Sequence, residues 1–454
     1  MEENKQNPLG SEPIPKLVTQ FAVPSIIAMV VSSVYNIVDQ FFIGQSVGAL
    51  GNAATSVFFP LTCGCIAVAL LCGVGGAASF NLSMGMGKTE DAGYYIGNAV
   101  FLMIAGSLVI MAAALLFTKP ILLFFGSSDE VLPYAMTYTR ICAVGFPGLI
   151  LQSGGTHLVR ADGRPQASMR VNLLGAGINI VLDALFVFGF GWGIAGAAAA
   201  TVIGQVVSAL LLLSYIAGFQ TVPIGKEAFF PRRSCLLRLI HLGMSNFITQ
   251  MAIMIVTVCT NKSLKYYGSL SVYGESIPVA IAGISGKCMQ LVMSVVIGFS
   301  QGMQPVTSYN YGAQQYGRVK KAYLTTISRA AVLPVIAWAL FQLFPRQIIG
   351  IFGTGEELYF AFGERYIRIA FLTLFTHFLQ PITANFFSSI GKPQRGIFLS
   401  MTRQIIFFLP LLLVLPMFLG IDGVMWATCI ADGMAFVVCI IVIAAELRRK
   451  EYRS

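Results

Sequence analysis

The stretch that decides the fold is residues 168–217, which read SMRVNLLGAGINIVLDALFVFGFGWGIAGAAAATVIGQVVSALLLLSYIA. It contains two apolar runs, 168–190 and 192–217, and a helix of about 20 apolar residues spans the hydrocarbon core of a bilayer. Only a glycine-rich turn at 189–193 separates the runs, so the two predicted helices are neighbours. A carboxylate, Asp183, stands inside the first run. An ionisable residue within a spanning segment is a candidate functional group.

The whole chain has the same apolar character. Of its 454 residues, 56% are hydrophobic and 11% are charged, and the mean hydropathy is +0.77. Soluble domains carry about 25% charged residues, so this chain has too few polar side chains to cover a water-soluble body. Composition therefore excludes a soluble enzyme and a disordered protein. It predicts an all-α polytopic membrane protein.

Twelve such runs can be read along the chain. They are residues 17–41, 51–77, 93–117, 134–157, 168–190, 192–217, 237–262, 274–301, 320–344, 365–389, 396–417 and 420–446. Residues 1–16 form a polar tail without the pattern of a cleaved signal peptide. A basic linker at 218–236 divides the chain into halves at 17–217 and 237–446, and residues 447–454 form a second tail.

The net charge of +10 raises the question of a nucleic-acid partner. The Lys and Arg residues cluster in short loops on one side of the predicted membrane, whereas the other side shows little beyond Lys119, Lys262, Lys265 and Arg346. Such an asymmetry is the positive-inside pattern. We therefore expect a cell-membrane protein with both termini in the cytoplasm and no nucleic-acid partner.

The nine cysteines form neither a metal-ligand pattern nor a disulfide framework. Most lie inside apolar runs, and the one close pair, Cys63 and Cys65, lies in a helix rich in small residues. We expect them to be buried small side chains, with no resident metal or cofactor.

The two halves repeat each other. Gly193 begins a segment, GIAG followed by ATVIGQ at 200–205, that recurs 227 positions later as GIDG and ATCIAD at 427–432. The loop GRPQ at 163–166 recurs as GKPQ at 391–394, and we match Gly73 and Gly87 to Gly298 and Gly312. An even number of spans per half makes the repeats parallel, an architecture of transporters with the substrate site between the halves and access that alternates.

The acids inside the spans mark the candidate site. Asp39 shares a helical face with Tyr35, and Asp183 shares one with Asn179 and Asn172, while Thr201 follows in the next span. Their oxygen atoms would form a cage for a proton or for Na⁺. The alternatives are that Asp39 is a solvated helix-end residue and that Asp183 only makes structural hydrogen bonds.

Other charged residues in the spans have no assigned role. Asp432 falls opposite Gln205 in the repeat and could serve packing or coupling. Lys287 and Arg403 are either buried cations or residues whose side chains reach the interface. His157 is expected at the interface, and a lone His377 in the tenth span does not make a proton relay.

Pro24 lies inside the first span, upstream of Asp39. Proline removes a backbone hydrogen bond and kinks a helix. The position predicts either a hinge between two states or a static bend.

Together these motifs resemble the multidrug and toxic compound extrusion (MATE) transporters, above all their prokaryotic DinF and MepA-like branch. The residues that carry the likeness are Pro24, the run YNIVDQFFIG at 35–44, the GRPQ loop, and NIVLD at 179–183 with Thr201. The resemblance implies two six-helix lobes forming a V-shaped cavity and cation-driven efflux of cationic, aromatic compounds. It implies a cation or proton site at Asp39, Asn179, Asp183 and Thr201, with Tyr35 lining the cavity.

The chain departs from the NorM-like branch, whose members carry acids in spans seven and ten. Span seven here offers Gln250, Thr257 and Thr260, and span ten offers His377, Gln380 and Asn385. We therefore expect coupling in the first half. The residues expected to line the substrate cavity are Tyr35, Asn36, Asn172, Gln250, Gln380 and Asn385.

Two function classes remain open. The first is an antiporter, not an enzyme, that acts as a monomer and exchanges drugs or toxic metabolites for H⁺ or Na⁺. The second is a flippase for a lipid-linked or polyprenyl-linked intermediate, which would line its cavity with several Lys or Arg. Only Lys287, Arg403 and Arg140 lie at membrane depth, beside at least two acids, so cationic cargo is favoured. A channel is a distant third.

Overall fold

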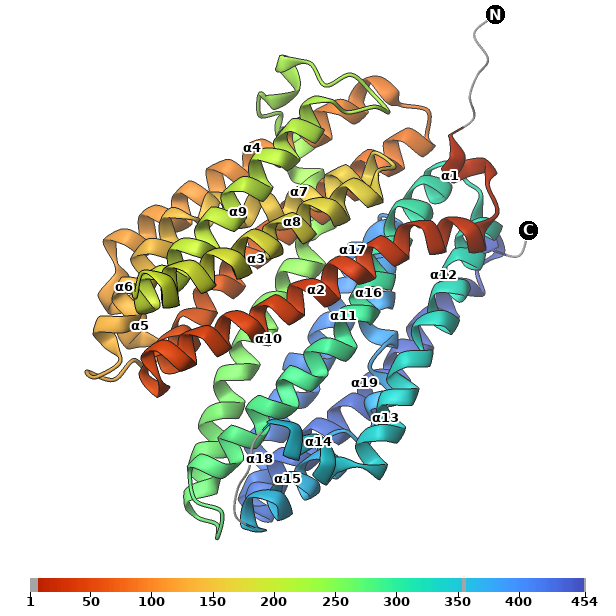
Figure 1. Cartoon of the computed structure of the whole chain (residues 1–454). Coiled ribbons are helices and arrows are strands. Elements are labelled where there is room, and N and C mark those ends of the chain that lie inside the picture. Colours follow the sequence, from red (N-terminus) through yellow and green to blue (C-terminus); the bar gives the residue numbers. More distant parts are fainter. Residues whose placement is uncertain (1–6, 353–356, 453–454) are drawn as a thin grey trace, which may run out of the picture.

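The computed structural model describes residues 7–352 and 357–452, which fold into two side-by-side bundles of helices (Figure 1). The first bundle comprises α1 (Pro8–Ser11), α2 (Ile14–Val47), α3 (Ala49–Gly85), α4 (Thr89–Leu116), α5 (Thr118–Phe124), α6 (Leu132–Val144), α7 (Phe146–Ala161), α8 (Pro165–Asp183), the π-helix η1 (Ala184–Gly189) and α9 (Gly193–Ala217). A 3₁₀ turn, η2 (Lys226–Phe229), lies in the linker.

The second bundle follows the same plan. It comprises α10 (Arg233–Ser269), α11 (Ser276–Gly312), α12 (Tyr316–Ala330), α13 (Val332–Leu343), α14 (Pro345–Phe352), α15 (Glu357–Ala370), η3 (Leu374–Thr376), α16 (Leu379–Ser389), α17 (Pro393–Met401), the π-helix η4 (Thr402–Phe408), α18 (Leu409–Leu419), α19 (Ile421–Leu447) and η5 (Lys450–Tyr452).

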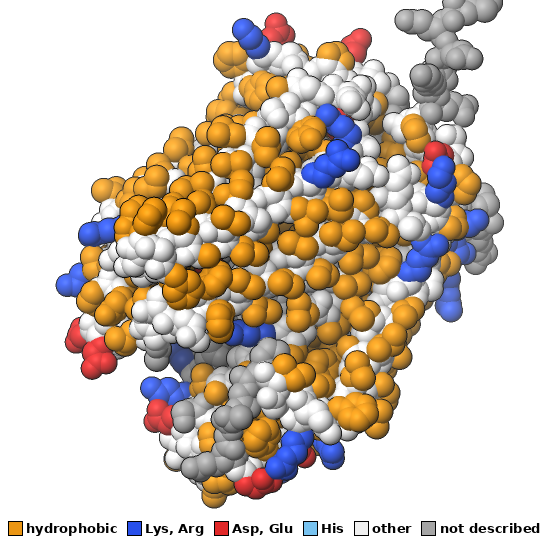
Figure 2. Space-filling model, in the orientation of Figure 1, with side chains coloured by type: hydrophobic (Ala, Val, Ile, Leu, Met, Phe, Trp, Pro, Cys, Tyr) orange, Lys and Arg blue, Asp and Glu red, His pale blue; other side chains and the backbone are white. Residues whose placement is uncertain are grey.

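Eleven helical segments of the described chain are long and apolar enough to cross a membrane. The expected fourth span is the exception, because it is divided into α6 and α7 at Gly145. Pro147 has no N–H to donate to the carbonyl of Ala143, which accounts for the interruption. The two pieces together supply the twelfth crossing. Apolar side chains cover the middle of the molecule and charged ones gather toward its two ends (Figure 2), as a bilayer requires.

Both ends of the described chain lie on one side of the bundles (Figure 1), which we call the chain-end side. Residues 8–16, predicted to belong to a polar tail, are instead folded as α1 and the start of α2. Leu9 and Ile14 are buried against Val306 of α11, and Arg318 of the second half donates to the carbonyls of Leu9 and Glu12. An apolar contact thus anchors the N-terminal segment on the opposite half.

The halves meet through two equivalent helix pairs. α2 packs along α11, and α3 packs along α10. In the repeat, α2 corresponds to α10 and α3 to α11, so the two pairs are the same contact related by a two-fold axis along the membrane normal. The parallel-repeat prediction is consistent with this arrangement.

Glycines allow these helices to approach closely. A Cβ atom added to Gly243 would overlap the carbonyl of Leu71, and one added to Gly302 would lie 2.5 Å from Cα of Ala22. Gly85 and Gly312 face each other where α3 and α11 end. The repeat therefore pairs Gly312 with Gly85, and the predicted match to Gly87 was wrong.

Glycine conformation also supports the repeat in two turns. Gly163 and Gly391 of the GRPQ and GKPQ loops have φ values of 81° and 76°, and Gly193 and Gly420 have values of 54° and 60°. Residues with a Cβ atom rarely adopt such angles. The equivalent loops of the two halves therefore have the same backbone conformation, which requires glycine at the same positions.

The contacts between the halves lie toward the chain-end side. Ser33 of α2 and Ser294 of α11 form the outermost hydrogen bond, at 2.5 Å. Among the described residues, no hydrogen bond or close glycine contact joins residues 34–62 to the second half. In the described chain, the hydrogen bonds and close glycine contacts between the halves thus lie toward one end. Pro24 lies within α2, which continues as one helix past it.

Candidate functional site

Two buried carboxylates face each other in the first half. Asp39 of α2 is 8% exposed and Asp183, the last residue of α8, is fully buried, and the two side chains interact. The burial of Asp39 excludes a solvated helix-end residue. In the described chain neither acid forms an ion pair.

These carboxylates are short of partners. Oδ1 of Asp39 and both carboxylate oxygens of Asp183 are buried without a hydrogen-bond donor. Two neighbouring negative charges would be strongly unfavourable away from water. The pair therefore requires a shared proton or a cation to be stable.

A change of helix type positions Asp183. α8 ends at this residue, and the chain continues as the π-helix η1. Single π-helical turns occur frequently at functional sites because they alter the direction of side chains without ending the helix. The sequence contains no proline that would signal this change between Asp183 and Gly189.

Asn179 and Thr201 connect α8 to α9 beside the acids. The amide nitrogen Nδ2 of Asn179 donates to Oγ1 of Thr201 at 3.2 Å, while Oδ1 of Asn179 is buried without a partner. A cavity of about 10 Å³ adjoins them and is also lined by Tyr35 and Gln205. Its volume suits a single water molecule or ion. The structure thus brings together the four residues predicted to hold the cation.

Sequence reasoning missed two neighbours of this site. Tyr138 and Cys142, one turn apart on α6, interact electrostatically with Asp39. The ring of Tyr138 also packs edge-on against Phe58 of α3, with centroids 5.1 Å apart. In the sequence, the only indication of these two neighbours was the spacing of Tyr138 and Cys142, four residues apart within an apolar run.

The residues predicted to line the cavity lie in different surroundings. Asn36 is exposed and Asn172 is half-buried, and each bonds a carbonyl of its own helix. Gln250 of α10 interacts with Cys63 of α3. The amides of Gln380 and Asn385 donate to the carbonyls of Leu399 and Ser300, at 3.0 and 2.9 Å. The last two side chains therefore join helices within the second half.

A second buried polar cluster occupies the second half. Asp432 of α19 receives a hydrogen bond from Nε of Arg403 at 2.5 Å, and its other oxygen contacts Nε2 of His377. His377 and Asp432 are almost fully buried, and Arg403 keeps about 26% of its side chain exposed. Asp432 therefore has a charged partner in Arg403, and His377 is not isolated, a grouping that the sequence did not reveal.

Two other basic residues can now be placed. His157, predicted at the membrane interface, is buried by protein together with Arg160 at the end of α7. His157 interacts with Gln304 of α11, so helix packing between the halves covers it. Lys287 on α11 is half-buried.

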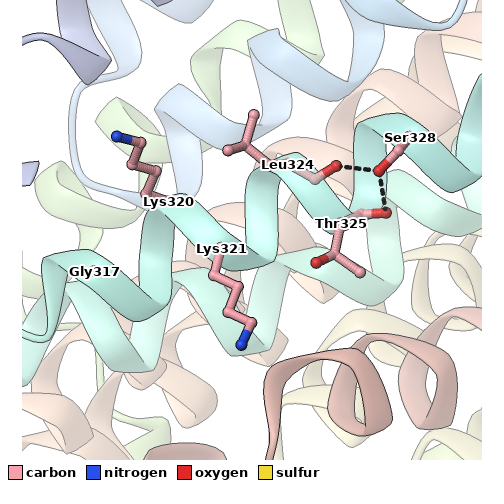
Figure 3. A pocket seen from close by; sticks show the side chains of 6 residues that line it. All are labelled: Gly317, Lys320, Lys321, Leu324, Thr325 and Ser328. Atoms are coloured by element: carbon pink, nitrogen blue, oxygen red, sulfur yellow. Dashed lines mark hydrogen bonds between the residues drawn. The ribbon is translucent and has the colours of Figure 1, made fainter.

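A surface hollow of about 340 Å³ follows one helix, α12, of the second bundle and is lined by neither acid (Figure 3). Lys320 and Lys321 extend in different directions from α12, and Oγ of Ser328 bonds the carbonyl of Leu324 at 2.6 Å. Side chains that fan out from a single helix do not converge on a ligand, so this hollow is not the substrate site.

The comparisons with known proteins agree with this geometry. Residues 24–185 and 247–414 match the MatE family, one segment in each half. The chain belongs to the MatE family. The multidrug export protein MepA of Staphylococcus aureus (strain MRSA252) is 23% identical over 432 residues, covering 95% of this chain and 94% of MepA. MepA of Staphylococcus haemolyticus (strain JCSC1435) is 24% identical over 435 residues, with the same coverage.

Solved MatE-type structures share the fold. A multidrug resistance MATE family transporter of the MOP superfamily, described as outward-facing, has a TM-score of 0.90 at 23% identity and covers 98% of both chains. A MOP superfamily transporter from Pyrococcus furiosus has a TM-score of 0.89 at 23% identity, covering 97% of both. The predicted family and the all-α, two-bundle architecture are confirmed.

Proposed function

We propose that this MatE protein is a secondary active multidrug efflux transporter of the cell membrane, not an enzyme, which exchanges cationic, aromatic compounds for H⁺ or Na⁺. The observation that carries the proposal is the Asp39–Asp183 pair, buried and without a basic partner in the described chain. A site that is stable only when it holds a proton or cation can couple transport to an ion gradient. Asn179 and Thr201 supply further oxygen ligands.

Alternating access requires two arrangements of the halves. The contacts described here close the chain-end side, which the positive-inside pattern assigns to the cytoplasm. We infer that this arrangement is the one open toward the outside. The relatives named multidrug export proteins favour drugs as the cargo, and the protein would act as a monomer.

The flippase alternative finds less support. It needs free basic side chains in the cavity to hold a pyrophosphate. Arg403, one of the three basic residues predicted at membrane depth, is paired with Asp432, so its charge is already compensated. The acids of the first half are uncompensated, which favours a cationic cargo.

The test is efflux of a fluorescent cationic dye from inverted vesicles, with pH and Na⁺ gradients imposed separately. Asp39→Asn and Asp183→Asn should each reduce gradient-driven efflux at least 100-fold, because the amide keeps the shape but cannot exchange a charge. Asp129→Asn, a change at an exposed acid of the loop after α5, serves as the matched control. Near-normal efflux by both buried-site variants would overturn the proposal.

A further inference from the structure

One carboxylate in the second half has two potential cationic partners. Oδ1 of Asp432 accepts from Arg403 and Oδ2 contacts His377. A single positive charge neutralises a single buried carboxylate. While Arg403 is bound, the carboxylate of Asp432 is already neutralised and His377 need not be protonated. When Arg403 is absent, a proton on His377 is needed to neutralise this carboxylate.

The three residues come from three spans, two of them irregular at this point. His377 lies in the break between η3 and α16, where Pro381 cannot donate to its carbonyl. Arg403 lies in the π-helix η4. Broken and π-helical segments within membrane spans are typical of sites that bind ions or change conformation.

The repeat places this cluster opposite a cavity in the first half. Asp432 corresponds to Gln205, 227 positions earlier, and Arg403 corresponds to Gly175 by the offset of the GRPQ and GKPQ loops. Both Gln205 and Gly175 line the 10 Å³ cavity beside Asn179. The two halves thus differ at equivalent positions. Charged side chains occupy this position in the second half, whereas the first half has a small cavity there.

We propose that His377, Asp432 and Arg403 form a second proton-binding site, in which a proton on His377 and the guanidinium of Arg403 compete to neutralise Asp432. In the unprotonated state the Nε2–H of His377 donates to Asp432, so the incoming proton from water binds Nδ1. The imidazolium then compensates Asp432 and frees Arg403. Because His377 is in the break of span ten, the exchange of partners shifts that span relative to η4.

Among the described residues, Arg403 and His377 are the charged groups that act on Asp432. Cys429, on the same helix as Asp432, interacts with it and with Thr373. In the described chain, every ion pair of the three residues is made within the cluster. Competition between His377 and Arg403 therefore dominates the response of Asp432 to pH.

The experiment is a pH titration of ¹³C-labelled histidine resonances in the purified full-length protein. The chain has three histidines, so His377→Gln identifies the resonance of interest. We expect the chemical shift of that resonance to change with pH. Arg403→Gln should alter this pH dependence, whereas Arg403→Lys, which keeps the charge, should leave it unaltered.

Two controls separate this inference from the proposed function. His241→Gln, a change at an exposed histidine of α10, should leave the resonance of His377 unaltered, as should Asp183→Asn. The titration measures proton binding without transport. Its result therefore tests this inference even if the efflux experiment contradicts the proposed function. A His377 resonance whose chemical shift does not change with pH, or a pH dependence that Arg403→Gln leaves unaltered, would overturn the inference.

Discussion

Gly75 offers a direct test of how the halves close. Its Cα in α3 lies against the backbone of α10, where an added Cβ would overlap the carbonyl of Leu239 and lie 3.0 Å from the amide nitrogen of Gly243. Backbone atoms cannot move aside as a side chain can. Gly75→Ala must therefore separate α3 from α10 where they cross.

The size of the effect follows from this overlap. Overpacking of this kind costs about 1–3 kcal/mol. The penalty falls on the arrangement closed at the chain-end side and is relieved when α3 and α10 part there. A cost of about 2 kcal/mol changes the ratio of the two arrangements by about 30-fold.

The assay is the distance between spin labels at Ser128 and Leu270, exposed residues of different halves on the opposite side. Cys259, which is half-buried whereas the other eight cysteines are buried, is replaced by alanine in every sample. Gly75→Ala should increase the fraction of molecules in which the two spin labels are closer together. Gly64→Ala, in the same helix with open space around it, is the control. Identical distance distributions for the two variants would refute the reasoning.

Two further predictions concern the polar side chains of each half. If Na⁺ drives transport, Asn179→Ala and Thr201→Ala should raise the Na⁺ concentration for half-maximal efflux several-fold, because each removes an oxygen ligand, whereas a pure proton site would shift only the pH optimum. Gln380→Ala and Asn385→Ala should lower the free energy of unfolding by about 0.5–1.5 kcal/mol, because each removes an amide hydrogen bond that joins two helices. Gln250→Ala should instead change the range of drugs carried without changing ion stoichiometry. Uncoupled transport in Gln250→Ala would contradict this division of roles.

Local properties of the sequence determined the number and order of the spans. The apolar length of a run depends only on neighbouring residues, so all twelve crossings could be located. The parallel repeat was equally accessible, since glycines such as Gly193 and Gly420 meet a backbone requirement that is local. The acids Asp39 and Asp183 were identified because a charge in an apolar run is rare.

Only the tertiary structure decided which side chains meet. His377, Arg403 and Asp432 lie in three different spans, and their grouping depends on how each helix is rotated about its axis. Pro147 and Pro381 cause the breaks near Gly145 and His377, but only packing against other helices makes such breaks tolerable within a membrane span. The burial of Leu9 against Val306 needed a partner nearly 300 positions away. Hydropathy describes each span's affinity for lipid, whereas these contacts arise from the shapes of helices packed against each other.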